Sequence, residues 1–176
     1  MKNIYPFLFL LTFCFTACDD SDQPLPEELK SGKTLFQIEL TDAPGDYQEV
    51  NIDIQKVRVQ IQDSNWIDLT TNAGFYDLLK LQNGVDTTIV KDSLSKGTYI
   101  TQMRLILGDS NNVMVDSQYF DLKIPSGSAS GFKIQFQDSL VADSLNIKLD
   151  FDAEKSIIKK GNKNDYSLKP VIKVIK

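Results

Sequence analysis

Apolar and polar side chains alternate with a period of two through most of residues 34–176, and this rhythm limits the possible folds more than any other feature. The clearest runs are Phe36–Leu40, Phe132–Phe136 and Leu145–Phe151, in each of which every second residue is apolar. Successive side chains of a β-strand point to opposite faces of its sheet. The pattern therefore predicts strands with one buried face and one face in water.

The rhythm changes phase once within a single long run. Val50–Ile54 is apolar at even positions, whereas Val57–Ile61 is apolar at odd positions. A β-bulge near Gln55-Lys56 would keep the same face buried through this slip. Clusters of Gly, Asn, Asp and Ser separate the runs and predict hairpins around residues 108–112 and 161–165. In Leu78–Leu81 a short helical turn competes with a strand.

About seven to nine short strands of this kind predict an all-β domain, an antiparallel β-sandwich that occupies residues 34–176. Amphipathic helices do not alternate with the strands, which argues against a parallel α/β sheet. Hydrophobic residues make up 41% of the chain and charged residues 24%, which suits one globular domain. Pro170 cannot donate a ladder hydrogen bond, so the last run is expected to be an edge strand or to carry an irregularity.

The first 17 residues have the features of a lipoprotein signal peptide. Lys2 gives a minimal positive start, and Ile4–Phe15 is an apolar run too short for a transmembrane helix of about 20 residues. Threonine and alanine precede Cys18 as in a lipobox, although phenylalanine stands where leucine is usual. We therefore expect cleavage before Cys18 and lipidation, including palmitate, of that residue, which anchors the chain to a membrane. The alternative is an uncleaved anchor helix.

Residues 18–33 are expected to form the lipidated cysteine and a flexible acidic tether, because they are too polar to bury a core. Asp19, Asp20 and Asp22 follow the cysteine directly. Such a cluster resembles the surface-export signal of some Gram-negative lipoproteins. In enteric bacteria, an aspartate at this place resembles an inner-membrane retention signal instead, and the cluster also suits a plain solvated tether. We expect an outer-membrane protein at the cell surface, with a periplasm-facing orientation as the alternative.

Composition excludes several functions. The chain has no histidine, which excludes Ser-His-Asp and Cys-His catalysis and His-ligated zinc. Its formal net charge is -5, and its two arginines are Arg58 and Arg104. An acidic chain with so few arginines lacks the positive surface that attracts phosphate backbones, so no nucleic-acid partner is expected.

Several segments together resemble the bacterial lipoprotein family known as domain-of-unknown-function family 4382. The more specific ones are LTDAP at residues 40–44 and LDFDA at 149–153 with Ser156-Ile157, and weaker ones are VNIDI at 50–54, GTY at 97–99 and LKPVI at 168–172. The resemblance spans about residues 34 to 175. It implies an immunoglobulin-like or transthyretin-like sandwich on a cell-envelope lipoprotein, and it implies no established activity.

Four carboxylates form the first candidate site. Asp42 and Asp46 belong to one turn, and Asp150 and Asp152 are expected on one face of a late strand. If the turn lay near that strand, the four acids could offer oxygen ligands to Ca²⁺. The other interpretation is that Asp42 caps a turn and the strand acids face water. A carboxylate pair for glycoside hydrolysis is a remote third possibility.

Two further residues stand out. The alternation of Ile67 and Leu69 places Trp66 on the opposite face, where it could stack on a sugar, join a protein interface or cover a sheet edge. Arg104 follows Met103 on a strand expected to be central. We interpret it as a buried structural charge that needs a carboxylate, for which Asp150 or Asp152 would serve.

The sequence therefore favours a non-enzymatic envelope module that binds a protein or a glycan or plays a structural part. The alternatives are a calcium-stabilised adhesion-type domain and, less favoured, a carboxylate-based glycoside hydrolase or its accessory domain.

Overall fold

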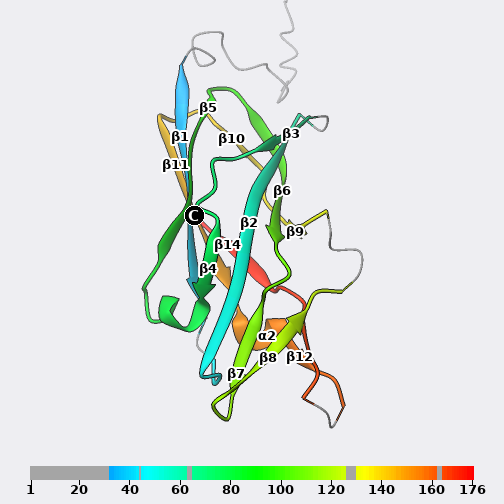
Figure 1. Cartoon of the computed structure of the whole chain (residues 1–176). Coiled ribbons are helices and arrows are strands. Elements are labelled where there is room, and N and C mark those ends of the chain that lie inside the picture. Colours follow the sequence, from blue (N-terminus) through cyan, green and yellow to red (C-terminus); the bar gives the residue numbers. More distant parts are fainter. Residues whose placement is uncertain (1–31, 44, 63–64, 126–129, 162–163) are drawn as a thin grey trace, which may run out of the picture.

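The computed structural model describes residues 32–43, 45–62, 65–125, 130–161 and 164–176, which form two packed β-sheets (Figure 1). Besides strands, these residues contain the short 3-10 helix η1 (Leu78–Leu81) and the short helix α2 (Ala153–Ser156). The predicted β-sandwich is confirmed, and of the two alternatives for residues 78–81 the structure has the helical turn. The described residues hold 14 strands, more than the seven to nine expected.

The smaller sheet has four strands. Their spatial order is β14 (Ile172–Ile175), β11 (Ser144–Phe151), β1 (Lys33–Asp42) and β5 (Thr87–Ser95). β1 and β11 run parallel, whereas the other two pairs are antiparallel. The expectation of a wholly antiparallel sandwich was thus wrong here, because β11 enters the sheet from a distant part of the chain rather than through a hairpin.

The larger sheet is built around β2 (Glu49–Ile61), which runs along the length of the molecule (Figure 1). One edge of β2 pairs with β3 (Asn65–Asp68) and then β4 (Gly74–Asp77). The other edge pairs with β6 (Tyr99–Leu107) and then β7 (Asn112–Val115). The predicted β-bulge is confirmed, since the register with β6 shifts between Ile54 and Lys56.

Further strands extend this sheet on both sides. β6 also pairs with β9 (Phe132–Ile134) and β10 (Asp138–Ser139), and β7 leads to β8 (Gln118–Lys123), β13 (Tyr166–Leu168) and β12 (Ile157–Lys159). β8 and β13 are a second parallel pair. β12 and β13 form the predicted hairpin around residues 161–165.

The hairpin predicted around residues 108–112 was wrong. β6 and β7 do not pair with each other but follow the same edge of β2 in the same direction. Between β6 and β7 the ladder along β2 is interrupted, and there the buried Asn111 side chain makes hydrogen bonds in place of the missing ladder bonds. Its Oδ1 accepts from Asp53 N at 2.9 Å and its Nδ2 donates to Gly108 O at 2.6 Å. The turn-forming residues here build a bulge rather than a reversal.

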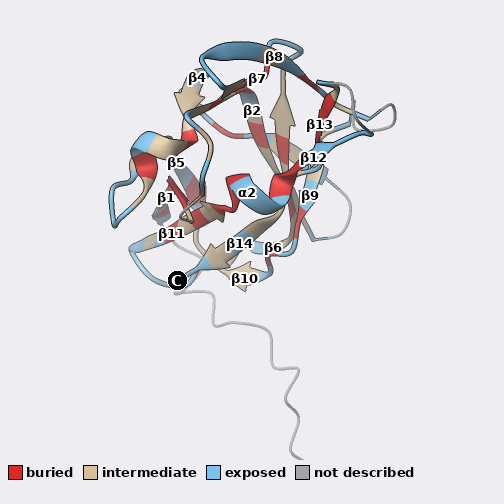
Figure 2. Cartoon of the chain, turned by 90° about the horizontal axis from the view of Figure 1, so that it is seen from below, coloured by how far each residue is buried: buried red, intermediate tan, exposed pale blue. Residues whose placement is uncertain are grey.

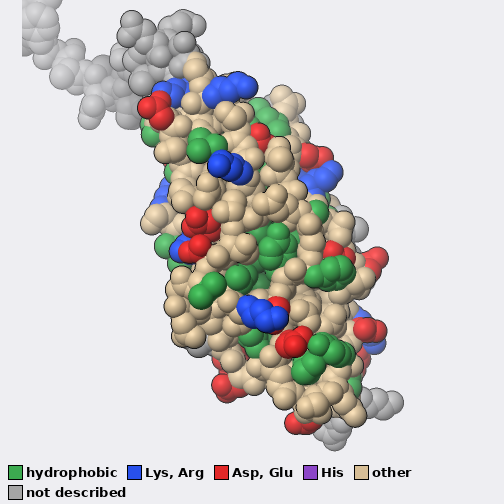
Figure 3. Space-filling view, turned by 60° about the vertical axis from the view of Figure 1, so that its left-hand side comes forward, with side chains coloured by type: hydrophobic (Ala, Val, Ile, Leu, Met, Phe, Trp, Pro, Cys, Tyr) green, Lys and Arg blue, Asp and Glu red, His purple; other side chains and the backbone are tan. Residues whose placement is uncertain are grey.

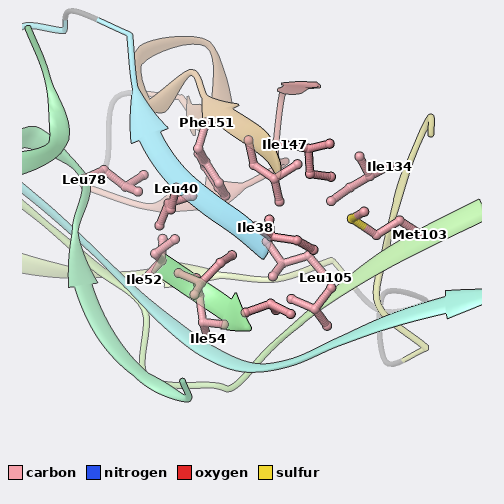
Figure 4. Close-up of a cluster of buried hydrophobic side chains, with 14 of the residues drawn as sticks. Ile38, Leu40, Ile52, Ile54, Leu78, Met103, Leu105, Ile134, Ile147 and Phe151 are labelled. Carbon is pink, nitrogen blue, oxygen red and sulfur yellow. The ribbon is translucent and has the colours of Figure 1, made fainter. Parts of the chain in front are cut away.

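The core fills the space between the two sheets. Apolar side chains from both sheets and from η1 point toward one another, and Figure 4 labels ten of them: Ile38, Leu40, Ile52, Ile54, Leu78, Met103, Leu105, Ile134, Ile147 and Phe151. Seen from below, buried residues line the facing sides of the sheets and α2 closes the space between them (Figure 2). The last apolar run is split at Pro170, between β13 in the large sheet and β14 in the small one.

Residues 1–31, which include the predicted signal peptide, Cys18 and most of the tether, lie outside the described residues. Within the described ranges, none of the helices has the length and apolar character needed to cross a membrane.

Candidate functional site

Asp42 is a buried junction between three elements. It is the last residue of β1, and it is only 5% exposed. Oδ1 accepts a hydrogen bond from Ala153 N at the start of α2, at 2.9 Å. Oδ2 accepts one from Nε2 of Gln82, the residue that ends η1, at 3.1 Å. Asp42 thus ties β1 to both short helices rather than capping its own turn.

The surroundings of Asp42 make its charge costly. Burial raises its pKa to about 6, and the negative charges of Asp150 and Asp152 add to that rise. The bonds from Ala153 and Gln82 oppose the rise without cancelling it. A carboxyl group in this state changes its charge between pH 5 and 7, within the range of ordinary environments.

Asp152 does not share a strand face with Asp150, and that expectation was wrong. β11 ends at Phe151, and Asp152 is the N-cap of α2, where its Oδ1 accepts from Lys155 N at 3.0 Å. Burial opposes ionisation of Asp152, but the bonds from Lys155 outweigh it and lower the pKa. An Asp before a helix accepts such bonds naturally, because the first N–H groups of a helix lack partners.

Only three of the four candidate acids therefore lie close together. Asp42 lies near Asp150 and Asp152, whereas Asp46 lines a separate pocket of about 250 Å³ with Tyr47 and Met114. Among the described residues, no group of three or more Asp, Glu, Cys or His side chains has an arrangement that could hold a metal ion. Carboxylate oxygens of Asp42 and Asp152 are instead bonded to backbone N–H groups.

Trp66 belongs to a polar cluster on the outer face of the large sheet. Its cross-strand partner on β2 is Gln60, which pairs in turn with Gln102 on β6. Arg58 and Arg104 both lie over the indole ring, with Cζ at 5.7 and 4.6 Å from the ring centroid. Trp66 is partly buried and points away from the core, as the alternation of the sequence predicts.

The row of the sheet next to Trp66 is charged. Asp68, Arg58, Arg104 and Lys133 are successive cross-strand partners on β3, β2, β6 and β9. Asp68 binds Arg58 Nε at 2.6 Å and Lys56 Nζ at 2.7 Å, and the first of the causes that lower its pKa is the bond from Lys56. We call this charged row, together with the row that contains Trp66, the Trp66 cluster. Its members are Asp68, Arg58, Arg104, Lys133, Trp66, Gln60 and Gln102.

Arg104 is not the buried charge that the sequence suggested. It is partly exposed, and its recorded partners are the Trp66 ring and Ser130 O, which accepts from Nη1 at 3.2 Å. Neither Asp150 nor Asp152 forms an ion pair with it. The reason is that Met103 and Leu105 take the inward positions of β6, so the residue between them must face outward even on an inner strand.

Two exposed aromatic side chains continue this face toward the other end of β2. Phe75 on β4 pairs with Asp53 and is 65% exposed. Tyr119 on β8 is 57% exposed, and its hydroxyl donates to Glu49 Oε2 at 2.8 Å. In Figure 1 β2 lies in the foreground and no described element crosses in front of it.

The outer face of the small sheet is different. A shallow pocket of about 460 Å³ there is lined by Glu39, Lys148 and Lys176, among others. Its cations have partners, since Lys148 pairs with Asp86 at 2.6 Å and Lys176 with Asp138 at 2.8 Å. With the β1 and β5 side of the molecule brought forward, Figure 3 shows positive and negative side chains interspersed, without a field of one sign.

Arg58, Lys133 and Asp68 were not singled out from the sequence. A signal was present, because Arg58 alternates with the core residues Val57 and Val59 and must face the same side as Trp66's partner Gln60. The pairing of β9 with β6, which brings in Lys133, joins segments that no local pattern connects.

Comparisons with known proteins place the domain in a family. A search of the curated proteins and a search of the solved structures each found no match. The family model described as "Domain of unknown function (DUF4382)" matches residues 33–170, which include the Trp66 cluster and every strand except β14. The chain therefore belongs to the DUF4382 family.

Proposed function

We propose that this protein is a lipid-anchored protein of the outer membrane that faces the cell surface and binds a glycan without catalysis. The Trp66 cluster carries the proposal. It sets an indole ring beside two amide side chains and several charged groups on an open sheet face. Aromatic rings stack on the apolar faces of sugars, and amides and charged groups bond to their hydroxyls.

The length of the face supports an extended ligand. Trp66, Phe75 and Tyr119 lie beside successive parts of β2, which has 13 residues. At about 3.3 Å per residue, such a strand spans roughly 40 Å. A chain of several sugar rings lying along β2 could meet all three aromatic groups.

A glycan suits this surface better than a protein does. The central part of a protein interface is usually apolar and poor in charged residues. Here the aromatic groups are separated by polar and charged side chains, with Asp53 and Asn51 between Phe75 and Tyr119 along β2. Polar groups between aromatic platforms match a ligand whose own surface alternates hydroxyls with apolar ring faces.

The absence of histidine from the sequence and the placement of the shifted carboxylates support a role without catalysis. Asp42, the carboxylate whose pKa is raised among the described residues, and Asp152, whose pKa is lowered, are both buried and both accept backbone hydrogen bonds at α2. The other shifted carboxylates, such as Glu49 and Asp68, have lowered pKa values and would not act as acids. A catalytic acid and base would need to reach a substrate.

The anchor rests on the residues around Cys18. An apolar run followed by threonine and alanine before the cysteine suits cleavage and lipidation, and the acidic residues that follow favour the cell surface. Palmitate labelling of cells should mark the wild type and not Cys18→Ser. Protease added to intact cells should then remove the labelled protein, whereas protection from protease would favour the periplasmic orientation.

The glycan proposal is tested through the single tryptophan of the chain. The full-length protein in detergent is screened against neutral and acidic oligosaccharides, and a ligand should change the fluorescence of Trp66 in a saturable way. Calorimetry with Trp66→Ala should then show at least tenfold weaker binding, as expected for a stacking contact. Ile175→Ala, which trims an exposed side chain on the opposite sheet, is the control and should bind normally. Binding that survives Trp66→Ala unchanged would contradict the proposal.

A further inference from the structure

Arg104 and Lys133 are adjacent cations without a carboxylate partner among the residues that the structure describes. They are direct cross-strand partners on β6 and β9, and neither forms an ion pair there. Lys133 is exposed, and Arg104 is partly exposed. The protein as a whole carries a net charge of -5, so neighbouring unpaired cations run against its composition.

The cations nearest the β3 end of this face already have a carboxylate partner. Lys56 and Arg58 share Asp68, at 2.7 and 2.6 Å. The row therefore has its negative charge at one end, on β3, and its unpaired positive charges at the other, on β6 and β9. An anionic group would be drawn to the β6 and β9 end.

The guanidinium of Arg104 is held in place and still has donors to spare. Its Cζ lies over the Trp66 ring, 4.6 Å from the ring centroid, and Nη1 donates to Ser130 O, so two contacts restrain the side chain. Its Nε is buried from solvent and has no hydrogen-bond partner among the described residues, so a ligand carboxylate would be bonded through the Nη groups of this partly exposed residue. A guanidinium stacked on an aromatic ring keeps its N–H groups directed along its own plane, where they suit the two oxygens of a carboxylate.

From this arrangement we propose that the Trp66 cluster binds an acidic sugar, with a hexuronate carboxylate held by Arg104 and Lys133 and the sugar ring packed beside Trp66. The inference rests on the proposed glycan binding and adds the charge of the ligand. Gln60 and Gln102, which form the row that contains Trp66, can bond to the ring hydroxyls.

The test compares an acidic oligosaccharide with its own neutral form. Tetragalacturonate and tetramers of hyaluronan and alginate are titrated into the full-length protein. Each is compared with the same oligosaccharide after its carboxyl groups have been reduced to alcohols. At least one acidic form should bind, and its reduction should weaken binding by about tenfold, the loss typical of one charge-assisted contact. Raising the salt concentration should weaken binding of the acidic form and leave binding of the carboxyl-reduced form unchanged.

Matched variants locate the contact. Arg104→Gln should weaken binding of the acidic form by about tenfold, and Lys133→Gln by a smaller factor, while neither changes binding of the reduced form. Lys91→Gln removes the same charge from an exposed site on β5 and should have no effect. If Arg104→Gln impairs folding, the exposed Lys133 still tests the same contact.

The possible failures are distinct. If acidic and reduced forms bind equally and Trp66→Ala abolishes both, the carboxylate contact is refuted while glycan binding stands. If a sulfated oligosaccharide that has no uronate carboxylate binds as tightly as the uronates, the site recognises an anion in general, and the uronate assignment is refuted. If neither acidic nor neutral glycans alter the Trp66 signal, both proposals fall.

Discussion

Replacing Asp42 by asparagine should stabilise the protein at neutral pH, although it alters a buried and fully bonded residue. Asparagine keeps the shape of the side chain and an oxygen that accepts from Ala153 N, the 2.9 Å bond of the wild type. The Gln82 amide can turn its oxygen toward the new NH₂ group. What the substitution removes is the buried negative charge.

The size of the effect follows from the pKa. Asp42 has a pKa of about 6 in the folded protein against an ordinary aspartate value of 3.8, and burial is the main cause. The folded state therefore holds this proton more tightly than the unfolded state. Its stabilising contribution is complete below about pH 4 and is lost as the pH rises through 6. About two pKa units correspond to roughly 3 kcal/mol of unfolding free energy.

Urea unfolding of wild type and Asp42→Asn, followed by circular dichroism at pH 4.5 and pH 8, measures this directly. Because part of the unfolded chain's Asp42 is already ionised at pH 4.5, the variant should gain about 2 of the roughly 3 kcal/mol relative to wild type between the two pH values. With an m value of about 2 kcal/mol/M, that gain moves the midpoint difference by about 1 M. Taking the difference between the proteins cancels the titration of the other acids, such as Asp152.

Asp42→Ala is the matched control, because it removes the charge and also the acceptor for Ala153 N. It should be less stable than Asp42→Asn by about 1–3 kcal/mol at both pH values. If the midpoints of wild type and Asp42→Asn differ by the same amount at pH 4.5 and pH 8, the buried charge is not costly and the reasoning is refuted.

Three further outcomes are expected. Asn111→Ala should lower the unfolding free energy by about 1–3 kcal/mol, because Asp53 N and Gly108 O lose their partner, and a loss below 0.5 kcal/mol would contradict this. Leu105→Ala should cost about 2–5 kcal/mol in urea unfolding, since the residue is fully buried between the sheets; an unchanged midpoint would argue against the described core. Melting curves in calcium and in chelator should coincide, because Asp42 and Asp152 bind backbone N–H groups, and a calcium-dependent rise in Tm would restore the calcium hypothesis.

The sequence predicted best what depends on neighbouring residues. The period of two gave the strands, and the phase slip before Val57 gave the bulge of β2, because both follow from which face of one strand is buried. The same logic placed Trp66 on the outer face. The parallel pairing of β1 with β11 could not be found in this way, since it joins segments such as Leu35 and Ser144 that are far apart in the chain.

Two errors have simple physical causes. The residues Gly108 to Asn111 look like a hairpin turn, but turn-forming residues serve a bulge equally well when a side chain such as that of Asn111 completes the ladder. Arg104 was expected to be buried because its strand is internal to the sheet. A strand can be internal while one of its faces is open, and the side chains of Met103 and Leu105 already occupy the inward face.

The interpretation of the candidate acids was right about proximity and wrong about geometry. Asp42 does lie near Asp150 and Asp152, which their effect on its pKa shows. The strand ends one residue before Asp152, however, so this side chain caps α2. The four-residue helix Ala153–Ser156 interrupts the alternation of apolar and polar residues, and it was too short to be seen in the sequence pattern.

The most direct test of the binding surface is the indole N–H signal of Trp66, which is unique because the chain has one tryptophan. In a ¹⁵N-labelled sample titrated with the oligosaccharide that binds best, this signal and the side-chain signal of Arg104 Nε should shift together and saturate. Shifts confined to backbone amides around Asn146 and Lys148, in the pocket of the small sheet, with the indole signal unmoved, would contradict the account.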